Sequence, residues 1–144
     1  MKPSDKYQEI LNSSEFYADD SQRHAIDRLD ELQVELMNQQ VETDSWWRKL
    51  TTGSTTATVP SGLYFWGGVG RGKTFLMDIF YQCLPFEERK RLHFHAFMNQ
   101  IHHSLTQLSG IPNPLEVVAK DLALDMKVLC LDEFVITDIA DAMI

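Results

Sequence analysis

Residues 67–74, which read GGVGRGKT, constrain the fold of this chain more than any other stretch. They match the pattern G-x-x-x-x-G-K-[ST] at every fixed position, and they follow an apolar run, 63–66, that is typical of a buried strand. Glycines let the backbone turn tightly so that successive N–H groups point at an anion, and a helix starting near Gly72 adds the positive end of its dipole. The pattern predicts a phosphate-binding loop between a strand and a helix.

Each residue type in this loop predicts a role. Lys73 would reach the β- and γ-phosphates of a nucleotide, and Thr74 would bind Mg²⁺. The predicted nucleotide-binding residues are Gly67, Gly68, Val69, Gly70, Arg71, Gly72, Lys73, Thr74 and Phe75. The alternative is a glycine-rich turn that matches by chance, and a second motif makes that alternative weaker.

The second motif covers residues 127–133 and reads KVLCLDE. Four apolar residues followed by an acid indicate a strand buried on both faces, whose carboxylate emerges at the C-terminal end where ligands bind in open α/β sheets. Asp132 fits the acid that holds Mg²⁺, directly or through its water shell. Glu133 can polarise an attacking water, so we predict Glu133 and Lys73 as catalytic residues. The alternative for both acids is a solvated strand end.

Composition favours a single globular nucleotide-binding domain. The chain has 144 residues, of which 44% are hydrophobic. Its 21 acidic and 13 basic residues give a net charge of −8, which argues against nucleic-acid binding because phosphate neutralisation needs clustered Lys and Arg. The one dense basic run, at 89–91, is typical of a solvated loop before a strand.

The two cysteines and the N-terminus indicate the compartment. Cys83 and Cys130 fall in an expected helix and an expected core strand, so we interpret them as small buried residues in a reducing compartment rather than as a disulfide. The N-terminus has no apolar signal region, and no run is long enough to cross a bilayer. We expect a cytoplasmic protein without a transmembrane segment.

Hydrophobic periodicity divides the chain into three parts. Residues 1–50 are predicted as an N-terminal helical segment in which at least one of Trp46 and Trp47 is buried. The apolar stripe of this segment comprises Ala25, Ile26, Leu29, Leu32, Leu36 and Met37. Residues 51–61 are small and polar and predict a flexible linker. Residues 62–144 are predicted as an incomplete nucleotide-binding domain.

Within 62–144 the expected elements alternate as βαβαβ, which predicts an α/β fold with a parallel sheet and flanking helices. Strands are expected at 63–66, 91–97 and 127–131, and helices near 72–83, 99–108 and 116–123. The side chains expected to face the sheet from the first helix are Phe75, Leu76, Ile79 and Phe80. Residues 137–144 look like the capped beginning of a helix without an end, so we expect the sequence to be C-terminally truncated.

Together, these motifs and the segments 76–78, 93–95, 131–134 and 137–143 resemble the ZapE cell-division ATPases of the AAA+ class. The resemblance runs from about Tyr7 to Ile144, and its specific motifs begin after Gly62. It implies an AAA+-like P-loop fold, hydrolysis of ATP with Mg²⁺, a homo-oligomer, and action on the bacterial division ring through the tubulin-like protein FtsZ. Related mitochondrial proteins act in protein quality control, so the branch of the family is open.

The resemblance also implies roles for single positions. His95, expected near the end of a strand, corresponds to a polar group that can hold the catalytic Glu away from water, which makes His95 a candidate switch. Residues 19–22 lie where an N-terminal segment would contact adenine, whereas helix capping by Asp20 or Ser21 is the simpler explanation. The family usually has Arg where this chain has Ala96. Its arginine finger, its water-positioning Asn or Thr, and its helical lid would all follow Ile144.

Other functions stay open. A P-loop phosphotransferase would use the same loop, but it should carry Arg clamps for its acceptor and does not need Glu133. A GTPase is weaker, because no Asn-Lys-x-Asp segment occurs. A zinc module could use some of four histidines, although adjacent and i, i+2 histidines rarely converge without Cys or carboxylate ligands. These histidines are His93, His95, His102 and His103.

A non-catalytic fragment is the last alternative. In hydrolases with this pair of motifs, a further strand lies between the two motif strands, and here that strand would begin after Ile144. Its absence would leave an open apolar edge and poorly positioned acids. We therefore expect no significant ATP turnover from the 144 residues alone.

Overall fold

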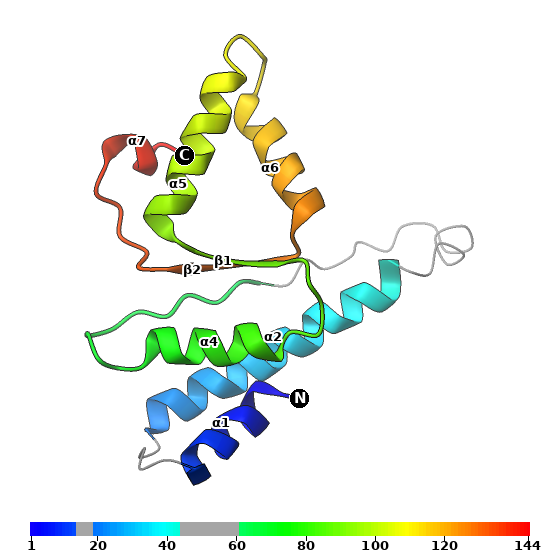
Figure 1. Cartoon of the computed structure of the whole chain (residues 1–144), viewed down its shortest axis with the longest axis vertical. Helices are drawn as coiled ribbons and strands as arrows, with labels where there is room; N and C mark the ends of the chain where they lie inside the picture. The colour runs from blue at the N-terminus through cyan, green and yellow to red at the C-terminus, as the bar shows by residue number, and fades with distance from the viewer. Residues whose placement is uncertain (14–18, 44–60) are drawn as a thin grey trace. The chain divides into compact units, whose positions relative to one another are not determined.

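The computed structural model describes residues 1–13, 19–43 and 61–144 (Figure 1). These residues form a mixed structure of helices and strands that divides into two compact units, Met1–Leu84 and Pro85–Ile144. Trp46, Trp47 and residues 51–60 of the predicted linker lie outside the described residues. In the described ranges, no helix has the length and apolar character needed to span a membrane.

Three helices build the first unit (Figure 1): α1 (Pro3–Ser13), α2 (Asp20–Thr43) and α4 (Lys73–Cys83). Each packs against the other two. The helices bury apolar side chains of all three elements, among them Tyr7, Ile26, Leu29, Leu76, Ile79, Phe80 and Cys83. Helical structure in the N-terminal segment is thus confirmed for α1 and α2. Of its predicted stripe, Ile26 and Leu29 are buried, whereas Met37 is exposed.

Helix α4 follows the phosphate-loop motif, as predicted. It ends at Cys83, because Leu84 is extended and Pro85 cannot continue the helix. Of the side chains expected to face a sheet, Phe75 is half-buried and the other three are buried. Within the first unit, however, the elements packed against α4 are the helices α1 and α2.

The strand predicted at 63–66 is wrong. In the described part of the chain, these residues belong to no helix and to no strand. Tyr64 and Trp66 are exposed, while Leu63 and Phe65 are half-buried. This alternation of exposed and half-buried residues is typical of a strand with one covered face. A strand also needs a neighbouring strand as a hydrogen-bonding partner, and the local sequence does not show whether such a partner exists.

The second unit contains a two-stranded parallel sheet (Figure 1). Strand β1 (Arg89–His93) pairs with β2 (Val128–Asp132), and His93 lies opposite Asp132. Two helices connect the strands, α5 (Phe94–Gln107) and α6 (Pro114–Asp125), and α7 (Ile139–Ala142) follows β2. Helix α5 packs against both strands and against α6. The predicted parallel pairing with helical crossover is confirmed for these two strands.

Two details of the sheet differ from prediction. Burial of β2 on both faces is wrong: Cys130 is buried, but Val128, Leu129 and Leu131 are only half-buried. The basic run 89–91, interpreted as a loop, forms the first three residues of β1. Its charges are compatible with a strand because Lys90 and Arg91 form ion pairs with Asp125 and Asp132.

The strand predicted over 91–97 is right only as far as His93. The chain becomes helical at Phe94, so His95 and Ala96 lie in the first turn of α5. Phe94, Met98 and Ile101 recur at helical spacing and are all buried, and this burial outweighs the short alternation that suggested a strand.

Several local predictions are confirmed. Cys83 and Cys130 are both buried free thiols, and burial raises the pKa of the Cys83 thiol, so it stays protonated at neutral pH. The capped helix start near the C-terminus is present, since the Asp138 carboxylate accepts a hydrogen bond of 2.9 Å from the Ala140 N–H.

Candidate nucleotide site

The phosphate-loop motif forms a turn that leads directly into α4. Gly70 and Gly72 have φ of +79° and +78°, a left-handed conformation that residues with a Cβ rarely adopt. Gly72 caps α4, and Lys73 is its first residue. The loop therefore ends at the N-terminus of an 11-residue helix, where backbone N–H groups and the helix dipole favour an anion.

Lys73 is held by the loop itself. Its Nζ donates hydrogen bonds to the carbonyl oxygens of Gly67 and Gly68, at 2.9 and 2.8 Å. The ammonium group therefore lies next to the first two residues of the loop. A phosphate oxygen would be a stronger, charge-assisted acceptor than these carbonyls, so Lys73 could exchange them for a bound anion. Thr74, the next helical residue, is exposed.

A pocket of about 510 Å³ lies beside this loop within the first unit. Helix α2 contributes Gln22, His24 and Arg28 to its wall, the extended segment contributes Tyr64 and Trp66, and the motif contributes Lys73 among others. Pockets for small ligands occupy roughly 300–1,000 Å³. The pocket is therefore large enough for a nucleotide next to the motif.

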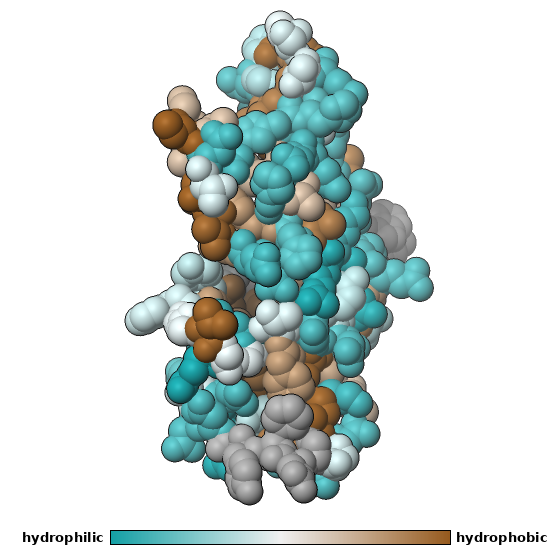
Figure 2. All heavy atoms as spheres, turned by 60° about the vertical axis from the view of Figure 1, so that its left-hand side comes forward, coloured by the Kyte–Doolittle hydropathy of each residue, from teal (hydrophilic) through white to brown (hydrophobic). Residues whose placement is uncertain are grey.

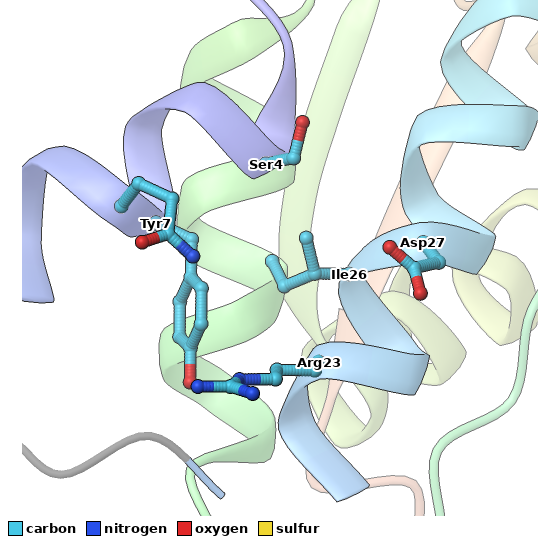
Figure 3. Close-up of a pocket in the computed structure, with 6 residues that line it drawn as sticks. Ser4, Tyr7, Arg23, Ile26 and Asp27 are labelled. Carbon is cyan, nitrogen blue, oxygen red and sulfur yellow. The ribbon is translucent and has the colours of Figure 1, made fainter. Parts of the chain in front are cut away.

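A smaller pocket of about 390 Å³ lies between α1 and α2 (Figure 3). It is lined by Ser4, Tyr7, Gln8, Arg23, Ile26 and Asp27, and contains none of the predicted site residues. Figure 3 shows the ring of Tyr7 extending from α1 toward the beginning of α2.

The two motif acids lie at the C-terminal end of β2, in the second unit. The Asp132 side chain is only 16% exposed, and Arg91 Nη2 lies 3.3 Å from its Oδ2. Its Oδ1 accepts a 3.0 Å hydrogen bond from the Glu133 N–H. Both carboxylate oxygens thus have protein partners, so a metal ion at Asp132 would compete with the Arg91 guanidinium.

Glu133 has a left-handed backbone, with φ of +52°. In the described part of the chain, Asn113 is the other non-glycine residue with positive φ. Such a conformation costs on the order of 1–3 kcal/mol and is found preferentially at functional sites. The side chain of Glu133 is exposed, so it is accessible to water.

The sequence-predicted residues are distributed over both units. Residues 67–75 belong to the first unit, and Asp132, Glu133 and His95 belong to the second. His95 is exposed, with Nε2 3.3 Å from Asn99 Nδ2 in the same helix. Its expected position near a strand end is therefore wrong, because the strand ends at His93.

The histidines do not form a zinc site in the described ranges, where no group of three or more His, Cys, Asp or Glu side chains is placed to hold a metal ion. His102 has a different partner: its Nε2 lies 2.7 Å from Asp141 Oδ1, which links α5 to α7.

Three contacts of the site are not predicted by the sequence. Arg91 pairs with Asp132, and its place in the basic run was the only available signal. The resemblance predicts adenine contacts for residues 19–22, with helix capping as the simpler explanation, and in the structure Asp19 and Gln22 contact Arg71 of the loop.

Comparison with known proteins identifies relatives along the entire chain. A family model described as AFG1-like ATPase matches residues 1–144. Cell division protein ZapE of Escherichia coli (strain K12) is 43% identical over 154 residues, covering 100% of this chain and 40% of ZapE. Thus the chain spans less than half the length of this relative. No solved structure matches the chain.

Two eukaryotic relatives cover smaller parts of the chain. Uncharacterized protein C115.02c of Schizosaccharomyces pombe is 42% identical over 101 residues, covering 66% of this chain and 22% of that protein. Lactation elevated protein 1 homolog B of Danio rerio is 40% identical over 96 residues, covering 59% of this chain and 19% of that protein.

Proposed function

The chain belongs to the AFG1-like ATPase family, and we propose that it binds ATP with Mg²⁺ and hydrolyses it as part of an AAA+ type ATPase. The observation that carries this proposal is the loop at 67–74. It combines left-handed glycines, a lysine at a helix N-terminus and an adjacent pocket of about 510 Å³. These features fit the polyphosphate of a nucleotide.

The proposed roles follow from the chemistry of each group. Loop N–H groups and Lys73 bind the phosphates, and Thr74 and Asp132 hold Mg²⁺, which neutralises phosphate charge when bound. Glu133 orients a water molecule and accepts its proton. The left-handed backbone and exposure of Glu133 support this role. In a homo-oligomer, an Arg from a neighbouring subunit would complete the stabilisation of the transition state.

Replacement of Lys73 by Ala tests the phosphate site. We expect ATP affinity in the full-length protein to fall at least about tenfold, because a charge-assisted contact to the phosphates is worth roughly 1.5–3 kcal/mol. Calorimetric titration with ATP measures this change, with Lys120→Ala, an exposed lysine on α6, as the control. Equal ATP affinity of wild type and Lys73→Ala would contradict the assignment of the loop.

We further propose that the protein acts in cell division. This proposal rests on the similarity of the chain to cell division protein ZapE of E. coli. On this proposal the protein is cytoplasmic and acts on a division-ring protein such as FtsZ. ATP-dependent cosedimentation with FtsZ filaments tests it, and the absence of any ATP-dependent binding would favour the quality-control branch. A phosphotransferase, the remaining alternative, would release no inorganic phosphate from ATP.

We further infer that the 144-residue chain alone turns over no significant ATP. Two observations support this inference. The chain covers 40% of ZapE, and apolar side chains of the second unit are exposed, among them Val135, Ile139 and Met143. Figure 2 shows hydrophobic atoms at the surface on one face of the molecule. Robust, Lys73-dependent hydrolysis by a soluble, monomeric 144-residue chain would contradict this inference.

A further inference from the structure

The N-terminal helices reach the phosphate loop through a chain of hydrogen bonds. Gln22 Nε2, on α2, donates to the Arg71 carbonyl oxygen at 3.3 Å. The Tyr7 hydroxyl, on α1, donates to Gln22 Oε1 at 3.0 Å. A third contact is an ion pair of 3.2 Å between Asp19 Oδ2 and Arg71 Nη2. Gln22 and Asp19, at the N-terminal end of α2, therefore contact Arg71 of the loop, and Tyr7 of α1 is connected to it only through Gln22.

This chain of bonds fixes the orientation of the Gln22 amide. The Arg71 carbonyl can only accept a hydrogen bond, so the NH₂ group of Gln22 must face it and Oε1 must face Tyr7. Tyr7 cannot easily move away, since it is 1% exposed and its ring centroid lies 6.4 Å from that of Phe75. Gln22 is thus held between a buried tyrosine and the loop backbone.

The same amide packs closely on Gly72. A Cβ at Gly72 would lie 2.8 Å from Gln22 Nε2, a clash, and Gly72 also has φ of +78°. Because a trans peptide is planar, its C=O and N–H point in opposite directions. With the Arg71 carbonyl directed at Gln22, the Gly72 N–H points away from Gln22. Phosphate loops bind anions through such N–H groups.

We propose that Gln22 is a positioning residue for the phosphate loop. It holds the Arg71–Gly72 peptide in the orientation that binds phosphate, and Tyr7 keeps its amide aligned. The proposal rests on the nucleotide binding proposed above and extends the site to α1 and α2. It differs from contact between residues 19–22 and adenine, because the atom that Gln22 contacts is a backbone oxygen of the loop.

Gln22→Met tests the proposal, because Met has a similar length but no amide. Gln33→Met is a matched control on the same helix. Gln33 is buried, and its Nε2 donates to the carbonyl oxygens of Cys83, at 2.6 Å, and Met1, at 3.2 Å. Cys83 ends α4, so this control removes bonds between α2 and its neighbours at the opposite end of α4 from the loop.

We expect Gln22→Met to weaken binding of ATP by the full-length protein about three- to tenfold, the effect of losing one or two hydrogen bonds. Binding of inorganic tripolyphosphate should weaken by the same factor, because the loop and not the base is affected. Tyr7→Phe should weaken both ligands less than Gln22→Met. Gln33→Met should lower the melting temperature at least as much as Gln22→Met does. It should leave the affinities for ATP and tripolyphosphate unchanged.

Three results would overturn the proposal. Unchanged ATP affinity of Gln22→Met would show that the peptide needs no support. A loss for ATP but not for tripolyphosphate would place Gln22 at the base. Equal losses in Gln22→Met and Gln33→Met, in proportion to stability, would make the role structural. In all three cases wild type binds ATP, whereas failure of wild type to bind ATP would overturn the proposed function as well.

Discussion

Glu133 combines an exposed carboxylate with a strained backbone directly after the strand that carries Asp132. A glycine would adopt the same φ without strain, so the presence of an acid at this position favours a role for the side chain. The adjacent Asp132 has the opposite character: it is mostly covered and paired with Arg91. The two acids therefore differ in environment: Glu133 is accessible to water, whereas a metal ion at Asp132 would have to compete with Arg91.

Glu133→Gln should separate binding from hydrolysis. Gln keeps the size and much of the hydrogen bonding of Glu but cannot accept a proton from water. In the full-length protein we expect unchanged ATP affinity and a fall in kcat of roughly a hundredfold or more. Calorimetry and phosphate release measure the two quantities. A parallel loss of both would identify Glu133 as a metal ligand or a structural residue.

At single positions, the sequence predicts what short-range patterns encode. The loop glycines and Lys73 occupy the expected turn and helix start because the motif itself dictates the backbone. The Gln22 contact could not be predicted, because 49 residues separate it from Arg71. The switch role of His95 stays a prediction, although its expected place at a strand end is wrong.

Among the helices and strands, the prediction was wrong where a strand-like alternation and a helical spacing of apolar residues overlapped. Around Phe94, alternation over a few residues suggested a longer strand, but the burial of Phe94, Met98 and Ile101 stabilises a helix. The parallel pairing of the two strands was predictable because two helices connect them. The state of residues 63–66 was not, because strand formation depends on a pairing partner.

An ion pair connects the residues that directly precede β1 and β2, and one of its partners, Glu88, is a carboxyl that titrates. Lys127 Nζ lies 2.9 Å from Glu88 Oε1, and the Lys127 N–H donates to the Glu88 carbonyl oxygen. The hydrogen bond from Lys127 lowers the pKa of Glu88 below its usual value of 4.5. A carboxyl whose pKa is lower in the folded state stabilises the fold above its unfolded pKa and loses that effect as pH falls.

Glu88→Gln should therefore reduce stability in a pH-dependent way. At neutral pH the variant should unfold at a lower urea concentration than wild type, because the ion pair is missing. This difference should shrink as pH falls below about 4.5, the usual pKa of a Glu, and should vanish once the pH is below the lower pKa that Glu88 has in the folded protein. Urea unfolding of both proteins, at neutral pH and at a pH below about 4.5, measures this difference. A difference independent of pH would show that the charge of Glu88 contributes nothing.

On the scale of the molecule, each compact unit carries one of the two motifs. The first unit contains the phosphate loop, and the second contains Asp132 and Glu133. The family model that matches the whole chain is that of an ATPase family, so we propose that each motif contributes to the binding or hydrolysis of ATP. Thr74 in the first unit and Asp132 in the second are the proposed Mg²⁺ ligands.

The most direct test is the Mg²⁺ dependence of ATP binding in wild type and Asp132→Asn, measured by calorimetry with Mg²⁺ and with a chelator. Wild type should bind ATP more tightly with Mg²⁺, and Asp132→Asn should lose that gain while its affinity without metal stays the same. Asn is nearly isosteric but lacks the charge that holds a hard cation. An unchanged Mg²⁺ gain in Asp132→Asn would contradict the assignment of Asp132 as a Mg²⁺ ligand.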